Sequence, residues 1–93
     1  MSHGGKKPYW DKQIDENSFL RTFSLNCDSS ELEWHRDVQN RQVEVISGKD
    51  WKFQYDNCLP ETIKPGDKII VEKNEWHRII KGSTDLILWV HEK

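Results

Sequence analysis

The chain has 93 residues, a formal net charge of −2 and five tryptophans. A chain of this length forms one domain with one modest core. Its near-neutral charge gives no electrostatic reason to expect a nucleic acid or an anionic membrane as partner, and no apolar run approaches the length that crosses a bilayer. We expect residues 8–93 to fold as one domain after a disordered tail of residues 1–7, which is polar and glycine-containing.

The chain from residue 19 to residue 91 consists of short segments with period-two alternation, separated by turn residues. Strands are expected at residues 19–25, 31–35, 41–47, 51–55, 59–63, 68–72, 76–81 and 84–91. Before them, we expect residues 8–10 to anchor on a sheet face and residues 11–18 to form a connection. Because no segment carries the 3.6-residue apolar repeat of a helix, the pattern predicts an all-β sandwich or barrel.

Glycine and proline mark two of the expected turns. Gly48 follows the strand expected at residues 41–47 and can take the positive φ of a hairpin turn. Pro65 and Gly66 occupy the two central positions of an expected type II turn. These two turns indicate where neighbouring strands reverse direction.

The sequence contains two cysteines, Cys27 and Cys58, and both lie in expected loops. Two unpatterned cysteines are too few for a disulfide framework or a cysteine-rich zinc site. We therefore expect free thiols and a cytoplasmic protein.

Strand alternation brings His35 and Asp37 to one side of the chain, because residues i and i+2 of a strand face the same way. Histidine and aspartate are both common metal ligands. A third ligand must come from a distant part of the chain, and His77 is the natural candidate. Two histidines and one carboxylate form the facial arrangement that leaves open positions on iron or a similar divalent metal.

Around these residues the chain resembles the cupin superfamily of small β-barrels, over roughly residues 19–91. Two motifs carry the resemblance, G-x5-H-x-H-x3,4-E-x6-G and G-x5-P-x-G-x2-H-x3-N. The first falls on Ser29, His35, Asp37, Arg41 and Gly48, and the second on Gly66, Glu72, Asn74, His77 and Lys81. The spacings agree without gaps, and the family residue is kept at His35, Gly48, Gly66 and His77. The resemblance implies a double-stranded β-helix (jelly-roll) barrel and a homodimer, since cupins of this size often pair.

Two motif positions depart from the family pattern. Asp37 replaces the second histidine and can still ligate, whereas Arg41 replaces the glutamate and cannot, because a guanidinium has only donors. In one interpretation His35, Asp37 and His77 bind metal, and Arg41 holds an anionic ligand beside it. In the other, Arg41 pairs with Asp37 and the site is metal-free, because a buried cation beside a metal is unfavourable unless an anion intervenes.

Gln54 and Arg78 are further candidates for contact with a ligand in the barrel. The His-x-Asp…His order is also similar to that of iron- and 2-oxoglutarate-dependent oxygenases, in which Arg41 or Arg78 would hold a dicarboxylate. The chain is short for that family and lacks its usual helical support.

Together these expectations describe a small cupin that binds a divalent metal (iron, nickel, manganese or zinc) and a small polar or anionic molecule. The corresponding activity would be that of a metal-dependent dioxygenase or isomerase. Two alternatives use the same pocket: a non-catalytic binding module for a sugar or a carboxylate, and an interaction protein with a vestigial site. No catalytic residue beyond the metal ligands is assigned.

Overall fold

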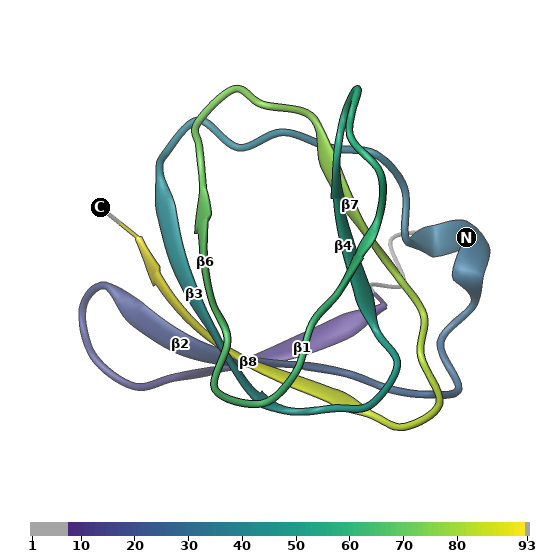
Figure 1. Ribbon diagram of the computed structural model, residues 1–93. Coiled ribbons are helices and arrows are strands. Elements are labelled where there is room, and N and C mark those ends of the chain that lie inside the picture. Colours follow the sequence, from purple (N-terminus) through teal and green to yellow (C-terminus); the bar gives the residue numbers. More distant parts are fainter. Residues whose placement is uncertain (1–7, 93) are drawn as a thin grey trace, which may run out of the picture.

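The computed structural model describes residues 8–92, which form two antiparallel sheets curving around a common interior (Figure 1). The five-stranded sheet, in the order β1-β2-β8-β3-β6, contains Tyr9–Gln13 (β1), Ser18–Phe23 (β2), Leu86–Glu92 (β8), Arg41–Ser47 (β3) and Lys68–Val71 (β6). The three-stranded sheet, in the order β5-β4-β7, contains Glu61–Thr62 (β5), Lys52–Tyr55 (β4) and His77–Ile80 (β7). Between residues 8 and 92 no α-helix occurs, and no helix is long and apolar enough to cross a membrane. The all-β prediction is confirmed.

The first strand of the structure was not expected from the sequence. Residues 9–13 form β1 and pair with β2 in continuous register, from Tyr9 opposite Phe23 to Gln13 opposite Phe19. Apart from Tyr9, which packs its ring against Phe23 at 5.3 Å between centroids, this strand is exposed. It forms an edge of the sheet, and a polar edge strand lacks the alternation by which buried strands are recognised. The tail proposed at residues 1–7 lies outside the described residues.

The strand expected at residues 31–35 is absent. Ser29–Glu31 instead form a short 3₁₀ turn, capped by the carboxylate of Asp28, which accepts a hydrogen bond from the backbone N–H of Ser30 at 3.0 Å. Side chains such as aspartate and serine favour local bonds of this kind over strand pairing. In this segment His35 alone pairs, through an isolated bridge to His77. The strand expected at residues 59–63 is shortened to Glu61–Thr62.

The inward faces of the five-stranded sheet follow the predicted alternation. Val43 and Val45 of β3 are buried, and so are Leu86, Leu88 and Val90 of β8. A β-bulge at Val45–Ser47 shifts the register between these two strands. The alternation therefore determines which side chains form the interior of the barrel.

One end of the barrel is closed by Trp51, whose side chain is fully buried and whose indole N–H donates to the backbone oxygen of Thr84 at 2.7 Å. Gly82 passes directly over this residue. A Cβ at Gly82 would lie 2.2 Å from the backbone oxygen of Lys49 and 2.6 Å from the backbone nitrogen of Trp51. Glycine at position 82 thus allows the two backbones to approach closely. Both cysteines are free, as expected.

We predict that Gly82→Ala destabilises the protein by more than about 3 kcal/mol, because rigid backbone atoms would have to move apart. Gly66→Ala is the matched control, because its Cβ would meet no atom within 4 Å. Its only cost is the left-handed backbone conformation, which destabilises by about 1–2 kcal/mol. Urea denaturation of both variants measures the difference. Equal losses would show that the close contact at Gly82 is not the cause.

Candidate metal centre

The chain contains two Trp-His-Arg triplets, at residues 34–36 and 76–78, and they pair with each other at their histidines. The backbone N–H of His35 donates to the oxygen of His77 at 3.0 Å, and the N–H of His77 donates to the oxygen of His35 at 2.9 Å. This reciprocal pair joins the irregular segment of residues 32–40 to the start of β7. It places both histidine rings on the inner side of the barrel.

The flanking residues of the triplets meet on the opposite side of the same bridge. In antiparallel pairing Trp34 lies across from Arg78, and Arg36 lies across from Trp76. The guanidinium carbon of Arg78 is 4.6 Å from the centroid of Trp34, and that of Arg36 is 5.2 Å from the centroid of Trp76. Two cation–π contacts therefore cover the outside of the histidine bridge.

The protonation of both imidazoles follows from their backbone partners. Nδ1 of His35 lies 3.2 Å from the carbonyl oxygen of Glu33, and Nδ1 of His77 lies 2.9 Å from that of Glu75. A carbonyl oxygen only accepts, so Nδ1 carries the hydrogen in each ring and Nε2 keeps its lone pair. Fixing the tautomer in this way is typical of histidines that ligate a metal.

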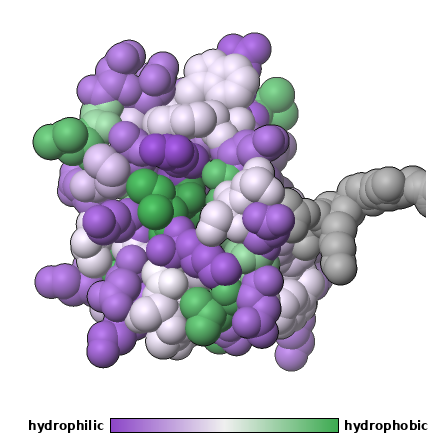
Figure 2. Space-filling model, turned by 90° about the vertical axis from the view of Figure 1, so that its right-hand side faces the viewer, coloured by the Kyte–Doolittle hydropathy of each residue, from purple (hydrophilic) through white to green (hydrophobic). Residues whose placement is uncertain are grey.

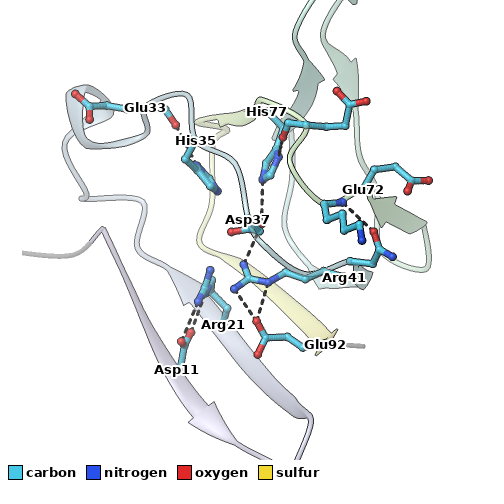
Figure 3. A network of polar contacts seen from close by, with 12 residues as sticks. Asp11, Arg21, Glu33, His35, Asp37, Arg41, Glu72, His77 and Glu92 are labelled. Carbon is cyan, nitrogen blue, oxygen red and sulfur yellow. Dashed lines mark hydrogen bonds and ion pairs between the residues drawn. The ribbon is translucent and has the colours of Figure 1, made fainter.

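The two rings and Asp37 converge on one point. His35, Asp37 and His77 each offer a ligand atom, and these atoms lie within 4.8 Å of one another. Both rings point toward the carboxylate of Asp37 (Figure 3). The ring centroids of the two histidines are 4.4 Å apart, and the His77 ring also stacks on Phe53 at 5.8 Å. The three residues predicted to bind metal are thus brought together.

The carboxylate of Asp37 lacks the hydrogen bonds that a buried acceptor normally has. Its Oδ2 is buried and accepts no hydrogen bond, although it lies 3.5 Å from Nε2 of His77. Burial lowers the pKa of His77 below its usual value, against the opposing effect of the hydrogen bond to Glu75. With a neutral ring, two lone-pair acceptors face each other. A cation between them would satisfy both, so the donor set fits a divalent metal.

Arg41 is neutralised mainly by a residue that the sequence did not point to. Its Nη2 and Nε donate to Oε2 of Glu92 at 2.8 and 3.0 Å, and its Nη1 lies 3.4 Å from Oδ2 of Asp37. The proposed pair of Arg41 with Asp37 is therefore present as a looser ion pair. Glu92 supplies the anion that makes a cation tolerable beside a metal. Glu92 lies on the same face of the strand as Leu88 and Val90, which could have indicated an inward position. The expected strand ended at residue 91, one residue before it.

A second arginine on the inner face was also missed. Arg21 of β2 donates from Nε and Nη2 to the two carboxylate oxygens of Asp11, at 2.9 and 3.0 Å. Its guanidinium carbon lies 3.8 Å from the ring centroid of Tyr9. Arg21 shares the parity of Phe19 and Phe23, which was the signal for an inward position.

Gln54 and Arg78 do not reach the interior. Nε of Arg78 donates to Oε1 of Gln54 at 2.9 Å, and both belong to the register positions of β4 and β7 that alternate with the inward Phe53, His77 and Ile79. Neither lines the cavity. Both lie on the outer face with Trp34 and not at the cavity where ligand contact was expected.

The interior of the barrel contains a cavity of about 250 Å³. His35, Asp37, His77, Arg41 and Arg21 line it together with the inward apolar side chains of both sheets.

No protein-family model and no curated protein matches the chain, whereas solved structures do. A structure of DMSP lyases gives a TM-score of 0.70 at 17% identity, over 82% of this chain and 37% of that chain. A cupin-2 domain containing protein from Shewanella frigidimarina gives 0.66 at 12% identity, over 91% and 79%. The iron(II) form of HppE gives 0.62 at 15% identity, over 82% and 41%. The chain spans less than half of the DMSP lyase chain and of HppE.

Two facing antiparallel sheets with histidines and a carboxylate gathered in the interior define a β-barrel with a possible metal centre. The chain has the cupin fold, as the motif spacing predicted.

We predict that the metal-free protein loses stability as the pH falls below about 6.5, the ordinary pKa of histidine. Because burial lowers the pKa of His77 in the folded state, the unfolded chain takes up a proton there that the folded chain resists. Above that pH the imidazole is neutral in both states and contributes nothing to the pH dependence of stability. Urea denaturation with chelator between about pH 5 and pH 8 measures how steeply the free energy of unfolding changes with pH. This dependence should be weaker in His77→Gln. An unchanged slope in that variant would contradict the assignment.

We further predict that Trp34→Ala and Arg78→Ala weaken metal binding by about tenfold although neither residue touches the metal site, a typical effect of outer-shell partners. Trp34→Phe should retain most of the affinity, because it keeps a ring under the guanidinium. Trp10→Ala removes an exposed tryptophan of β1 and serves as control. Titration with Zn²⁺ gives the affinities. If Trp34→Ala lowers the melting temperature but leaves the affinity intact, the residue stabilises the fold and does not position the histidines.

Proposed function

We propose that the chain is a small metal-dependent cupin in which His35, Asp37 and His77 hold a divalent metal, and in which a small molecule binds in the cavity beside it. The observation that carries the proposal is the arrangement of buried acceptors: Oδ2 of Asp37 faces Nε2 of His77 at 3.5 Å without a hydrogen bond. The guanidinium of Arg41 forms a looser ion pair with the same oxygen at 3.4 Å, also without a hydrogen bond. A metal between Oδ2 and Nε2 would therefore supply the close partner that both atoms lack. This arrangement also supports a working site over a vestigial one.

The ligand set favours a metal of the iron, nickel, manganese or zinc group. Two imidazoles and one carboxylate suit these ions and leave coordination positions open for a substrate. A bound metal of this kind supplies Lewis acidity or, for iron, redox activation. The similarity to the iron(II) form of HppE supports a metal-dependent reaction. Dioxygenation and isomerisation are the reaction types that we propose.

Arg41 has a defined part in this proposal. Glu92 holds its Nε and Nη2, while its Nη1 points to Asp37 at 3.4 Å. With a metal held by Asp37, Nη1 of Arg41 would be available to donate to an anionic group of the ligand. A non-catalytic binding module would use the same residues, and it differs from an enzyme in that the bound molecule is released unchanged.

The expected homodimer and the cytoplasmic location remain predictions. On the face that carries β4 and β7, hydrophobic residues are scattered among hydrophilic ones (Figure 2). The outer face of the five-stranded sheet exposes Trp10 and Ile70, and we propose this face for contact with a second copy.

We predict that the chelator-stripped protein binds one divalent ion, and that Asp37→Asn and His77→Gln each weaken binding by more than about 100-fold, beyond what outer-shell changes cost. Calorimetric titration with Fe²⁺, Ni²⁺, Mn²⁺ and Zn²⁺ measures this. The control is His91→Gln. His91 does not belong to the cluster, and its Nδ1 is hydrogen-bonded to the hydroxyl of Ser18 at 2.8 Å. Absence of binding to the unaltered protein would overturn the proposal. Equal weakening in His91→Gln would mean that the ions bind adventitiously.

A further inference from the structure

The polar and apolar side chains of the cavity occupy separate regions. His35 and Glu33 are exposed and mark the end that opens to solvent, beside Asp37 and His77. The remainder of the wall is mostly hydrocarbon, from both sheets: Val43, Phe53, Ile69, Ile79, Leu88 and Val90. Apart from Arg21, which is paired with Asp11, the polar partners for a molecule in this cavity therefore lie around Asp37.

The charges near the cavity are almost all compensated within the chain. Asp11 satisfies the guanidinium of Arg21 through two hydrogen bonds at 2.9 and 3.0 Å. Glu92 satisfies two nitrogens of Arg41. Within the described residues, Nη1 of each arginine has no hydrogen bond. Nη1 of Arg41 lies 3.4 Å from Oδ2 of Asp37, so these two groups can hold one headgroup together.

We infer that the ligand of this cavity is an amphipathic molecule with one anionic headgroup and an apolar body, such as a medium-chain or aryl carboxylate. The headgroup assignment rests on the proposed function, whereas the apolar body rests on the cavity wall. At about 30 Å³ for each water-sized unit, the volume of about 250 Å³ holds roughly eight non-hydrogen atoms. A sugar of similar size would bury hydroxyl groups without partners along the hydrocarbon wall.

Chain length provides the direct test. Acetate, butanoate and hexanoate are titrated into Zn²⁺-loaded protein by calorimetry, with threonate as a polyol of similar size to hexanoate. If the apolar body enters the cavity, affinity rises about fourfold with each added methylene, the equivalent of about 0.8 kcal/mol per buried CH₂. Hexanoate then binds much more tightly than acetate, and threonate binds no better than acetate.

Neighbouring isoleucines of β6 provide a matched pair of variants. Ile69 lines the cavity, whereas Ile70 is 53% exposed on the outer side of the same strand. Ile69→Phe adds ring atoms inside the cavity and should weaken hexanoate binding by tenfold or more while leaving acetate binding unchanged. Ile70→Phe adds the same atoms outside and should change neither. Circular dichroism and urea denaturation verify that both variants are folded.

The outcomes separate this inference from the proposed function. Affinity that is equal across the carboxylates, or that is highest for threonate, overturns the amphipathic ligand even when metal binds. Failure of the protein to bind any metal overturns the proposed function, and the same carboxylate series on the metal-free protein then decides the inference. Rising affinity with chain length supports an apolar body in either case, and a flat series overturns it. A variant pair in which Ile70→Phe weakens hexanoate as much as Ile69→Phe also overturns it.

Discussion

The reciprocal backbone pairing between His35 and His77 is the interaction on which the site depends. It joins a segment without regular secondary structure to β7, across more than forty residues of chain. Closing a loop of that length costs entropy before any contact forms. The register must also hold, because a shift of one residue would turn both histidines outward and both tryptophans inward. The pairing is therefore costly to form, and it decides whether the three residues of the candidate site meet.

Contacts on both sides of the bridge hold that register. Inside, the His77 ring stacks on Phe53, and the backbone oxygen of Asp37 accepts a hydrogen bond from Asn74 at 2.7 Å. Outside, Trp34 and Arg78 form one of the two crossed cation–π pairs. A register shifted by one residue would lose these contacts, because it would bury the guanidinium groups and expose the imidazole rings. In each Trp-His-Arg triplet, the central histidine therefore faces the candidate site. The flanking tryptophan and arginine stabilise the register through cation–π contacts on the outer face.

The fold and the cluster of His35, Asp37 and His77 could be predicted from the sequence because their signals are local or follow fixed spacing. Alternation in β3 placed Val43 and Val45 on one face, and the spacing of the two motifs brought out His35, Asp37 and His77. β1 was missed because an edge strand needs little apolar surface. Glu92 was missed because its role depends on the register of β8 against Arg41, and pairing partners far apart in the chain are not visible in either segment alone. Arg78 was expected to contact the ligand, whereas its position next to His77 on a strand places it on the opposite face.

A small barrel that keeps a cavity must recover stability elsewhere, and the distribution of packing shows where. Trp51, Leu86 and Val45 are at most 1% exposed, and none of them lines the cavity. They fill the end of the barrel opposite the histidines, where Gly82 allows the backbone to close over Trp51. Phe23 lies between the two regions, since it contacts Trp51 at 5.9 Å between centroids and also lines the cavity. The densely packed end therefore accounts for most of the buried core, and the residues around the cavity are less constrained by packing.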